Sequence, residues 1–354
     1  VVFFFQLNRH GERWPDEEEM SLSDQQDLLV NLTELEGPEG LTNMGKRRAF
    51  LIGEYYRSRY GAEGLQLISN LYKRDEISIR STDKERTKMT IQVAMAAVYP
   101  PLPAQQWDSR LGKFWQPVPY YSVPLAEDYL RYYSNCERYV NLMTAAKMQS
   151  LDEEFAPFMD LIPLLYEKTG RNFTENPLLF ESLYDLFLSL ETLGLDKPEW
   201  AKPQMARLEE AARKAYSLYF RNKMMKKIGG GVLLNEFIQT ADDIISGKDV
   251  NKRLRLFSSH DFNLGSFMAV SRVIVDSDIP KYGAVFSLEL FRSKSTGAYT
   301  VRPIYLRQAG EYAPEVLLIK DCVPCDYNSF KRKTEDFLLP EHEYYNLCNI
   351  RTEL

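Results

Sequence analysis

The sequence lacks the features of a membrane-spanning or nucleic-acid-binding protein. No stretch approaches the roughly 18 uninterrupted apolar residues that a membrane-spanning helix needs, so we expect no membrane span. The most basic run is Arg221–Lys227, which ends a helical stretch where basic side chains favour the negative helix end. Because the net charge is −6 and no long basic stripe is present, we expect no nucleic-acid partner.

Histidine and cysteine are also scarce, with three histidines and four cysteines in 354 residues. The acidic run Asp16–Glu19 predicts a solvated loop, because carboxylates adjacent in sequence rarely converge on one ion. We therefore expect no metal site in this run. Its 44% of hydrophobic residues are enough for a large core in one or two domains.

The few cysteines and two glycosylation sequons together indicate a secreted or lumenal protein. Asn31-Leu-Thr and Asn172-Phe-Thr are candidate glycosylation sites in polar surroundings. The opening run VVFFF predicts a strand, because it lacks a basic region and a cleavage site, and we expect a signal peptide to have been removed before it. An even number of cysteines fits two disulfides, with three pairings allowed. The cysteines are Cys136, Cys322, Cys325 and Cys348.

The order of predicted elements indicates an α/β fold with a doubly wound, mostly parallel sheet flanked by helices. The first strand, residues 1–7, is apolar at consecutive positions, as expected when helices cover both faces of a sheet. A helix follows the cap signal at Thr42. Next, a β-branched strand that ends near Arg80 leads into a helix that Pro100 and Pro101 terminate.

A smaller, all-helical insertion is predicted in the middle of the chain. Amphipathic segments dominate residues 125–233, where β-branched runs are absent. The predicted domains are therefore a discontinuous α/β domain, 1–124 and 234–354, and a helical cap domain, 125–233. Sheet character returns near residue 252, and the runs 284–293 and 298–306 predict a β-hairpin.

Three of the predicted strands end in clusters of charged residues. Because side chains at the carboxyl ends of strands converge in α/β sheets, we expect these clusters to form one site. Two of the three histidines belong to them, whereas His342 is interpreted as structural. The clusters are Arg9, His10 and Arg13 after the first strand, Arg80 after the second, and His260 and Asp261 after the third.

This combination of residue types suits phosphoryl transfer. Guanidinium groups match phosphate oxygens bidentately. A histidine flanked by arginines has a lowered pKa, which leaves the imidazole free to act as a nucleophile. A phosphoryl group that moves to this nitrogen needs its leaving oxygen protonated, and Asp261 is the acid beside a strand-end histidine.

The motifs resemble those of the histidine acid phosphatases, branch 2 of the histidine phosphatase superfamily. RHGERWP fits the signature R-H-G-x-R-x-P, and the later HD pair fits the second signature. IRSTDKERT is similar to the middle arginine segment, LTNMGK to the first helix, and GGGVLLNEF to the helix that leaves the insertion. The phosphoglycerate-mutase-like branch also begins R-H-G-E, but Arg13, Pro15 and the HD pair favour the acid phosphatases. The likeness is closest to the animal secreted type, including insect venom and salivary acid phosphatases.

The resemblance implies a secreted acid phosphatase that hydrolyses phosphate monoesters without a metal or cofactor. His10 would become phosphohistidine, and Asp261 would protonate the leaving alcohol. The implied phosphate ligands are Arg9, Arg13, Arg80 and His260. The implied disulfides are Cys136–Cys348 and Cys322–Cys325.

Three residues depart from the family pattern. Asn8 replaces an aromatic residue, Trp14 a small or aliphatic one, and Phe262 a small polar one. We expect Trp14 and Phe262 to lean over the pocket and narrow substrate choice toward flat aromatic phosphates. The alternative is an impaired phosphatase that binds biogenic amines or amphipathic mediators, with the aromatic faces and Glu12 or Asp261 holding a cation. A structural or adhesion role is the third class.

Oligomeric state is left open by the sequence. Trp107 and Trp115 fit either the core or a contact between two copies. The resemblance is compatible with a homodimer.

Overall fold

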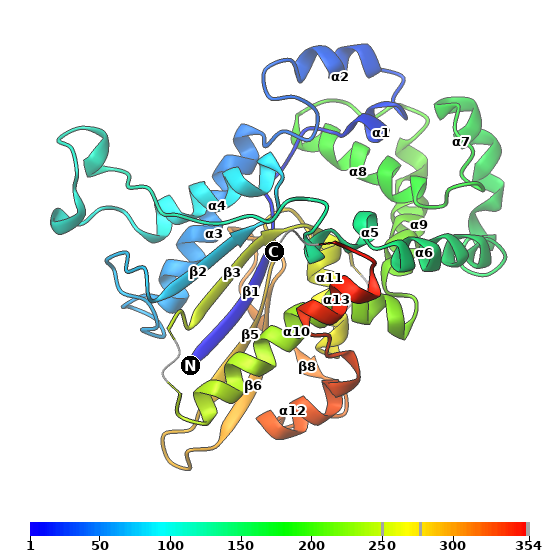
Figure 1. The fold of residues 1–354 in the computed structure, drawn as a ribbon. Helices are drawn as coiled ribbons and strands as arrows, with labels where there is room; N and C mark the ends of the chain where they lie inside the picture. Colours follow the sequence, from blue (N-terminus) through cyan, green and yellow to red (C-terminus); the bar gives the residue numbers. More distant parts are fainter. Residues whose placement is uncertain (249–250, 276–277, 352–354) are drawn as a thin grey trace.

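Six strands form the central sheet in the order β2-β3-β1-β5-β6-β7 in the computed structural model, which describes residues 1–248, 251–275 and 278–351 (Figure 1). The parallel half contains β1 (Phe3–Arg9), β2 (Ile77–Ser81) and β3 (Leu254–Ser259). The antiparallel half contains β5 (Val285–Arg292), β6 (Tyr299–Leu306) and β7 (Glu315–Val316). The predicted α/β class is confirmed, and β5 and β6 form the predicted hairpin.

Helices cover both faces of the sheet, which explains why β1 is apolar at consecutive positions. Side chains alternate along a strand, so Phe4 packs on Tyr60 of α3 with ring centroids 3.8 Å apart, whereas Phe3 packs on Phe237 of α10 at 5.5 Å. The first face is covered by α3 (Asn43–Tyr60) and α4 (Glu85–Val98), and the second by α10 (Lys223–Ile245) and α11 (Asp261–Val270).

The middle of the chain is helical, and it shares one hydrophobic core with the second face of the sheet. Its α-helices are α5 (Tyr132–Asn135), α6 (Glu137–Ser150), α7 (Ile162–Thr169), α8 (Leu179–Thr192) and α9 (Met205–Ser217). The boundary predicted at residue 233 falls inside α10, which runs unbroken through this position. The N-terminal helix α1 (Glu17–Met20) contacts α8, which joins the first loop to the insertion (Figure 1).

The remaining elements are short. They comprise α2 (Gln26–Leu32), α12 (Tyr327–Thr334), α13 (Glu341–Leu347), and the two-stranded sheet of β4 (Val273–Ile274) and β8 (Leu318–Ile319). The 3-10 helices are η1 (Pro103–Gln105), η2 (Leu111–Lys113), η3 (Tyr129–Arg131), η4 (Ala156–Leu161), η5 (Lys202–Gln204), η6 (Leu218–Phe220) and η7 (Glu335–Phe337).

The cysteines pair as the family resemblance implies, Cys136 with Cys348 and Cys322 with Cys325. Within the described ranges, no helix is both long and apolar enough to cross a membrane.

The exposure of the two sequon asparagines and of two tryptophans can be compared with the sequence predictions. Asn31 is exposed on α2, whereas the half-buried Asn172 side chain bonds Thr174 and Glu175. Trp107 and Trp115 are 54% and 37% exposed, so they do not belong to the core.

Candidate active site

Two histidines meet at the carboxyl edge of the sheet because their strands are neighbours. His10 follows β1 and His260 follows β3, and these parallel strands pair in a register that places Arg9 beside Ser259. The two imidazole centroids are 5.5 Å apart, and each side chain is only 2% exposed. Residues 250 positions apart in the sequence are thus brought into one site, as the motifs predict.

The His10 ring is held in the orientation that a nucleophile requires. Its Nδ1 lies 2.8 Å from the carbonyl oxygen of Gly11, which can only accept a hydrogen bond, so Nδ1 holds the proton. The lone pair of Nε2 then accepts a hydrogen bond from Nε of Arg86 at 3.0 Å. Burial, together with the charges of Arg86, Arg9 and Arg13, holds the pKa of His10 well below its ordinary value. The imidazole is therefore neutral, with Nε2 facing the site.

Arg86 is a residue of this site that the sequence reasoning missed. It lies in the first turn of α4, donates to Nε2 of His10, and places Nη2 3.4 Å from Nδ1 of His260. Burial and the neighbouring Arg13 lower the pKa of Arg86. A helix N-terminus that follows a strand is a common place for anion binding, and this was the available signal. Arg86 also belongs to the quoted segment IRSTDKERT.

Arg80 does not lie in the site, contrary to the sequence expectation. Its guanidinium forms a buried ion pair with Asp128 and stacks 4.1 Å above the ring of Tyr129. Both Arg80 and Asp128 are nearly inaccessible to solvent, at 4% and 0% exposed. Successive residues of a strand point to opposite faces of the sheet, so a residue near the end of β2 need not point into the site. Arg80 joins the sheet to the start of the insertion instead.

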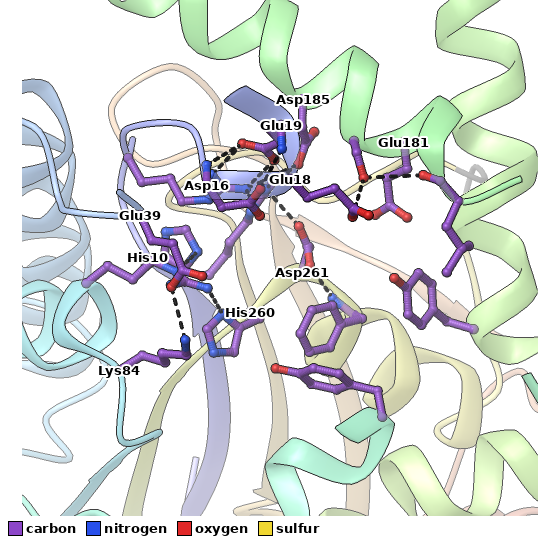
Figure 2. Close-up of a pocket in the computed structure, with 18 of the residues that line it drawn as sticks. His10, Asp16, Glu18, Glu19, Glu39, Lys84, Glu181, Asp185, His260 and Asp261 are labelled. Carbon is purple, nitrogen blue, oxygen red and sulfur yellow. Dashed lines mark hydrogen bonds and ion pairs between the residues drawn. The ribbon is translucent and has the colours of Figure 1, made fainter. Parts of the chain in front are cut away.

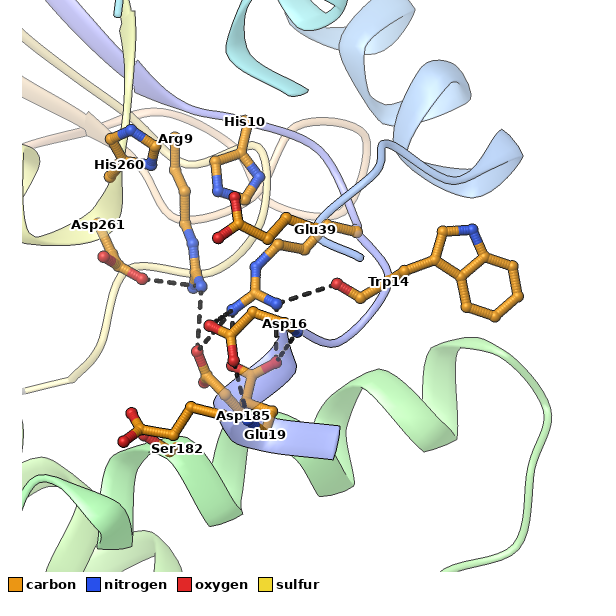
Figure 3. A network of polar contacts seen from close by, with 12 residues as sticks. Arg9, His10, Trp14, Asp16, Glu19, Glu39, Ser182, Asp185, His260 and Asp261 are labelled. Atoms are coloured by element: carbon orange, nitrogen blue, oxygen red, sulfur yellow. Dashed lines mark hydrogen bonds and ion pairs between the residues drawn. The ribbon is translucent and has the colours of Figure 1, made fainter. Parts of the chain in front are cut away.

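Arg9 lies beside His10 (Figure 3), Arg13 is also close enough for its charge to act on His10, and each arginine is paired with carboxylates. Arg9 bonds Asp261 at 2.8 Å, and its guanidinium stacks 4.1 Å above Tyr282. Arg13 forms a bidentate pair with Glu19 at 2.7 and 2.6 Å. The expectation that the acidic run 16–19 is a solvated loop is wrong, because this segment forms α1 and Glu19 is 2% exposed.

Asp261 and Phe262 begin α11 directly after His260. Asp261 reaches into the cavity from the first position of the helix and accepts a hydrogen bond from the Phe262 amide at 2.7 Å. The Phe262 ring stacks on His260 with centroids 5.3 Å apart, and Tyr133 and Tyr219 pack against it. Phe262 thus lines the cavity as part of an aromatic wall.

Trp14 and Glu12, which were expected to shape the pocket, face away from it. The Trp14 indole extends away from His10 and donates from Nε1 to Glu36 at 2.7 Å (Figure 3). Glu12 accepts from Arg48 at 3.0 Å. Asn8 is fully buried within the sheet, where its side chain accepts a hydrogen bond from Tyr56 at 3.2 Å.

Gly11 is required for packing. A Cβ at this position would lie 2.2 Å from the carbonyl oxygen of Gly45, so the glycine lets the loop after β1 cross α3.

The side chains enclose a cavity of about 390 Å³ between the sheet edge and the insertion (Figure 2). In the part of the chain that the structure describes, no group of three or more His, Cys, Asp and Glu side chains is arranged to hold a metal ion. Charged side chains of both signs line the cavity. The cations besides Arg9, Arg13 and Arg86 are Lys84, Arg131 and Lys147, and the carboxylates are Asp16, Glu18, Glu19, Glu39, Glu181, Asp185 and Asp261.

Comparison with known families identifies the family to which a chain with this site belongs. The model of the histidine phosphatase superfamily, branch 2, matches residues 3–306. The chain belongs to this family. The acid phosphatase resemblance predicted from the motifs is thereby confirmed.

Relatives of this family member include a venom and a prostatic acid phosphatase. The chain is 29% identical to the venom acid phosphatase of Apis mellifera, with 95% of this chain and 84% of that protein covered. It is also 29% identical to the prostatic acid phosphatase of Homo sapiens, with 89% and 80% covered. The phytase of Klebsiella sp. ASR1 shares the fold, with a TM-score of 0.69, 16% identity, and 96% and 98% coverage. These findings support a phosphatase enzyme and do not favour an amine-binding protein.

Proposed function

We propose that this protein hydrolyses phosphate monoesters through a phosphohistidine formed on His10. The observation that carries the proposal is the neutral His10 ring, whose Nε2 lone pair faces the cavity and lies among Arg9, Arg13 and Arg86. This arrangement offers a nucleophile together with positive charge for the phosphate oxygens.

In the first step, Nε2 of His10 attacks phosphorus, and the bond from phosphorus to the ester oxygen breaks. Asp261, in its protonated form, gives its proton to the departing oxygen, so the alcohol leaves neutral. In the second step, Asp261 accepts a proton from a water molecule that attacks the phosphohistidine. This releases inorganic phosphate and restores His10. Arg86, Arg9, Arg13 and His260 hold the phosphate oxygens in both steps.

The aromatic wall supports a substrate with a flat alcohol group. Phe262 stacks on His260, and Tyr133 lies against Phe262 with ring centroids 4.3 Å apart. A phenyl leaving group beside Asp261 would therefore have rings to pack on. This wall, and not Trp14, is the basis of the proposed preference for aryl phosphates.

We also propose secretion, with Asn31 and Asn172 as glycosylation sites. Two disulfides and two sequons support this proposal, and Asn31 is exposed. The exposed pair Trp107 and Trp115 is the proposed contact between copies in a homodimer. Deglycosylation followed by mass spectrometry, and light scattering, test these two points.

Turnover of p-nitrophenyl phosphate at about pH 4 to 6 tests the central proposal. His10→Ala should abolish turnover and prevent the acid-labile phosphoenzyme that rapid quenching with labelled substrate traps. His342→Ala is the matched control, since His342 is exposed on α13, and it should retain full activity. Undiminished turnover in His10→Ala would refute the proposal.

A further inference from the structure

Glu39 places a carboxylate on Arg86, one of the proposed phosphate ligands. It lines the cavity beside His10 (Figure 2). Its Oε2 accepts a hydrogen bond from Nζ of Lys84 at 3.1 Å and one from Nη1 of Arg86. The carboxylate therefore lies between two cations at the mouth of the site.

The backbone around Glu39 holds this side chain in place. Glu39 has φ 64°, a left-handed conformation that residues other than glycine adopt rarely. Its amide donates to the carbonyl oxygen of Pro15 at 3.2 Å, and the next residue, Gly40, accepts from the Trp14 amide at 2.9 Å. Two backbone hydrogen bonds thus tie this loop to the segment that follows His10. An uncommon conformation at a cavity is an observation from which a functional role can be inferred.

Each of the three guanidinium nitrogens of Arg86 has a partner in the free protein. Nε bonds His10, Nη2 lies against His260, and Nη1 bonds Glu39. A phosphate that reaches Nε2 of His10 needs these donors for its own oxygens. Among the described residues, Glu39 is the only anion for which an ion pair with Arg86 is recorded. A phosphate that binds Nη1 of Arg86 therefore competes with the Glu39 carboxylate.

We propose that Glu39 is an intramolecular competitor that sets the enzyme's affinity for phosphate groups. This inference rests on the proposed phosphatase function and adds a specificity-determining residue to it. Glu39 also competes with inorganic phosphate, the product, for Arg86. Inorganic phosphate has no alcohol group that could add binding contacts elsewhere in the cavity. Glu39 thus favours release of the product and relieves product inhibition.

The competitor remains charged through the weakly acidic range. Burial alone would raise the pKa of Glu39, but Arg86 and Lys84 hold it below its ordinary value. The charged and titratable groups that face it are Lys84 and Arg86 of the α4 region and His10 of the β1 loop. Because the pKa of Glu39 lies below its ordinary value, Glu39 should stay charged and compete for the cations throughout the weakly acidic range.

Glu39→Gln keeps the shape of the side chain and removes its charge. We expect the dissociation constant of inorganic phosphate, measured by calorimetry at about pH 6, to fall roughly fivefold, the size expected for one partly buried ion pair. The inhibition constant for phosphate and the KM for p-nitrophenyl phosphate should fall in parallel. Glu39→Asn, which suits a left-handed backbone better, should give the same direction.

Glu36→Gln is the matched control. This glutamate belongs to the same loop and pairs with Lys46 at 3.0 Å and with Trp14, outside the cavity, so phosphate affinity should not change. Weaker or equal phosphate binding in Glu39→Gln, with an active wild type, would overturn the inference, because Glu39 would then only position Arg86 or play no part. A wild type that neither turns over substrate nor binds phosphate would instead refute the proposed function itself.

Discussion

Replacing Arg86 by alanine is expected to lower kcat/KM for an aryl phosphate by about 10² to 10³, or roughly 2.7 to 4 kcal/mol of transition-state stabilisation. This is the usual cost of removing one pre-positioned donor to a developing anion. Arg86 contacts both His10 and His260, so the donor that is lost lies at the reacting group. Stability should change by no more than about 1 kcal/mol, because burial and Arg13 already disfavour this charge in the folded protein.

Arg80→Met should show the reverse pattern. It leaves the fully buried Asp128 without its cation, and breaking such a pair costs roughly 3 to 5 kcal/mol. At about 2.1 cal/mol/K per residue over 354 residues, the thermal midpoint should fall by roughly 4 to 7 °C. Protein that remains folded should keep kcat/KM within a few-fold of wild type.

Steady-state kinetics with p-nitrophenyl phosphate and thermal unfolding, measured on the same preparations, distinguish the two arginines. Loss of activity without loss of stability in Arg80→Met, together with a nearly active Arg86→Ala, would refute the assignment. Those results would indicate that Arg80, and not Arg86, binds the phosphate.

Three further predictions concern the acid, the tryptophan and pH. Asp261→Asn should lower kcat by roughly 10² or more for alkyl phosphates and much less for p-nitrophenyl phosphate, because the p-nitrophenyl leaving group needs no proton. Equal losses of kcat for the two substrates would contradict the proposal that Asp261 is the proton donor. Trp14→Phe should lower the free energy of unfolding by about 1 kcal/mol through loss of its bond to Glu36, and a changed KM would contradict its position outside the cavity. As pH falls below 6.5, urea unfolding should show declining stability, because unfolded His10 takes up a proton that folded His10, with its lowered pKa, does not. The decline should be smaller in His10→Ala, and an identical decline would argue against a lowered pKa.

The sequence predicted the fold class, and it placed the proposed nucleophile and acid on neighbouring strand ends, because these signals are local. His10 and Asp261 directly follow apolar strands, and the ends of neighbouring parallel strands meet at one edge. The hairpin of β5 and β6 was equally predictable, since two alternating runs flank a short polar turn. The helical character of the middle of the chain was visible as a loss of β-branched runs, but α10 runs unbroken through the boundary predicted at residue 233.

By itself, then, the sequence determined which chemistry is present and on which loops it lies. Only the tertiary structure decided which side chains take part, because that depends on where partners distant in sequence lie. Arg80 pairs with Asp128, 48 residues away, outside the site, and Trp14 donates a hydrogen bond to Glu36 outside the cavity. Arg86 enters instead because α4 begins beside the two histidines. The orientation of these side chains depends on the alternation of strand residues and on buried ion pairs with distant partners, and a motif in one segment does not show either.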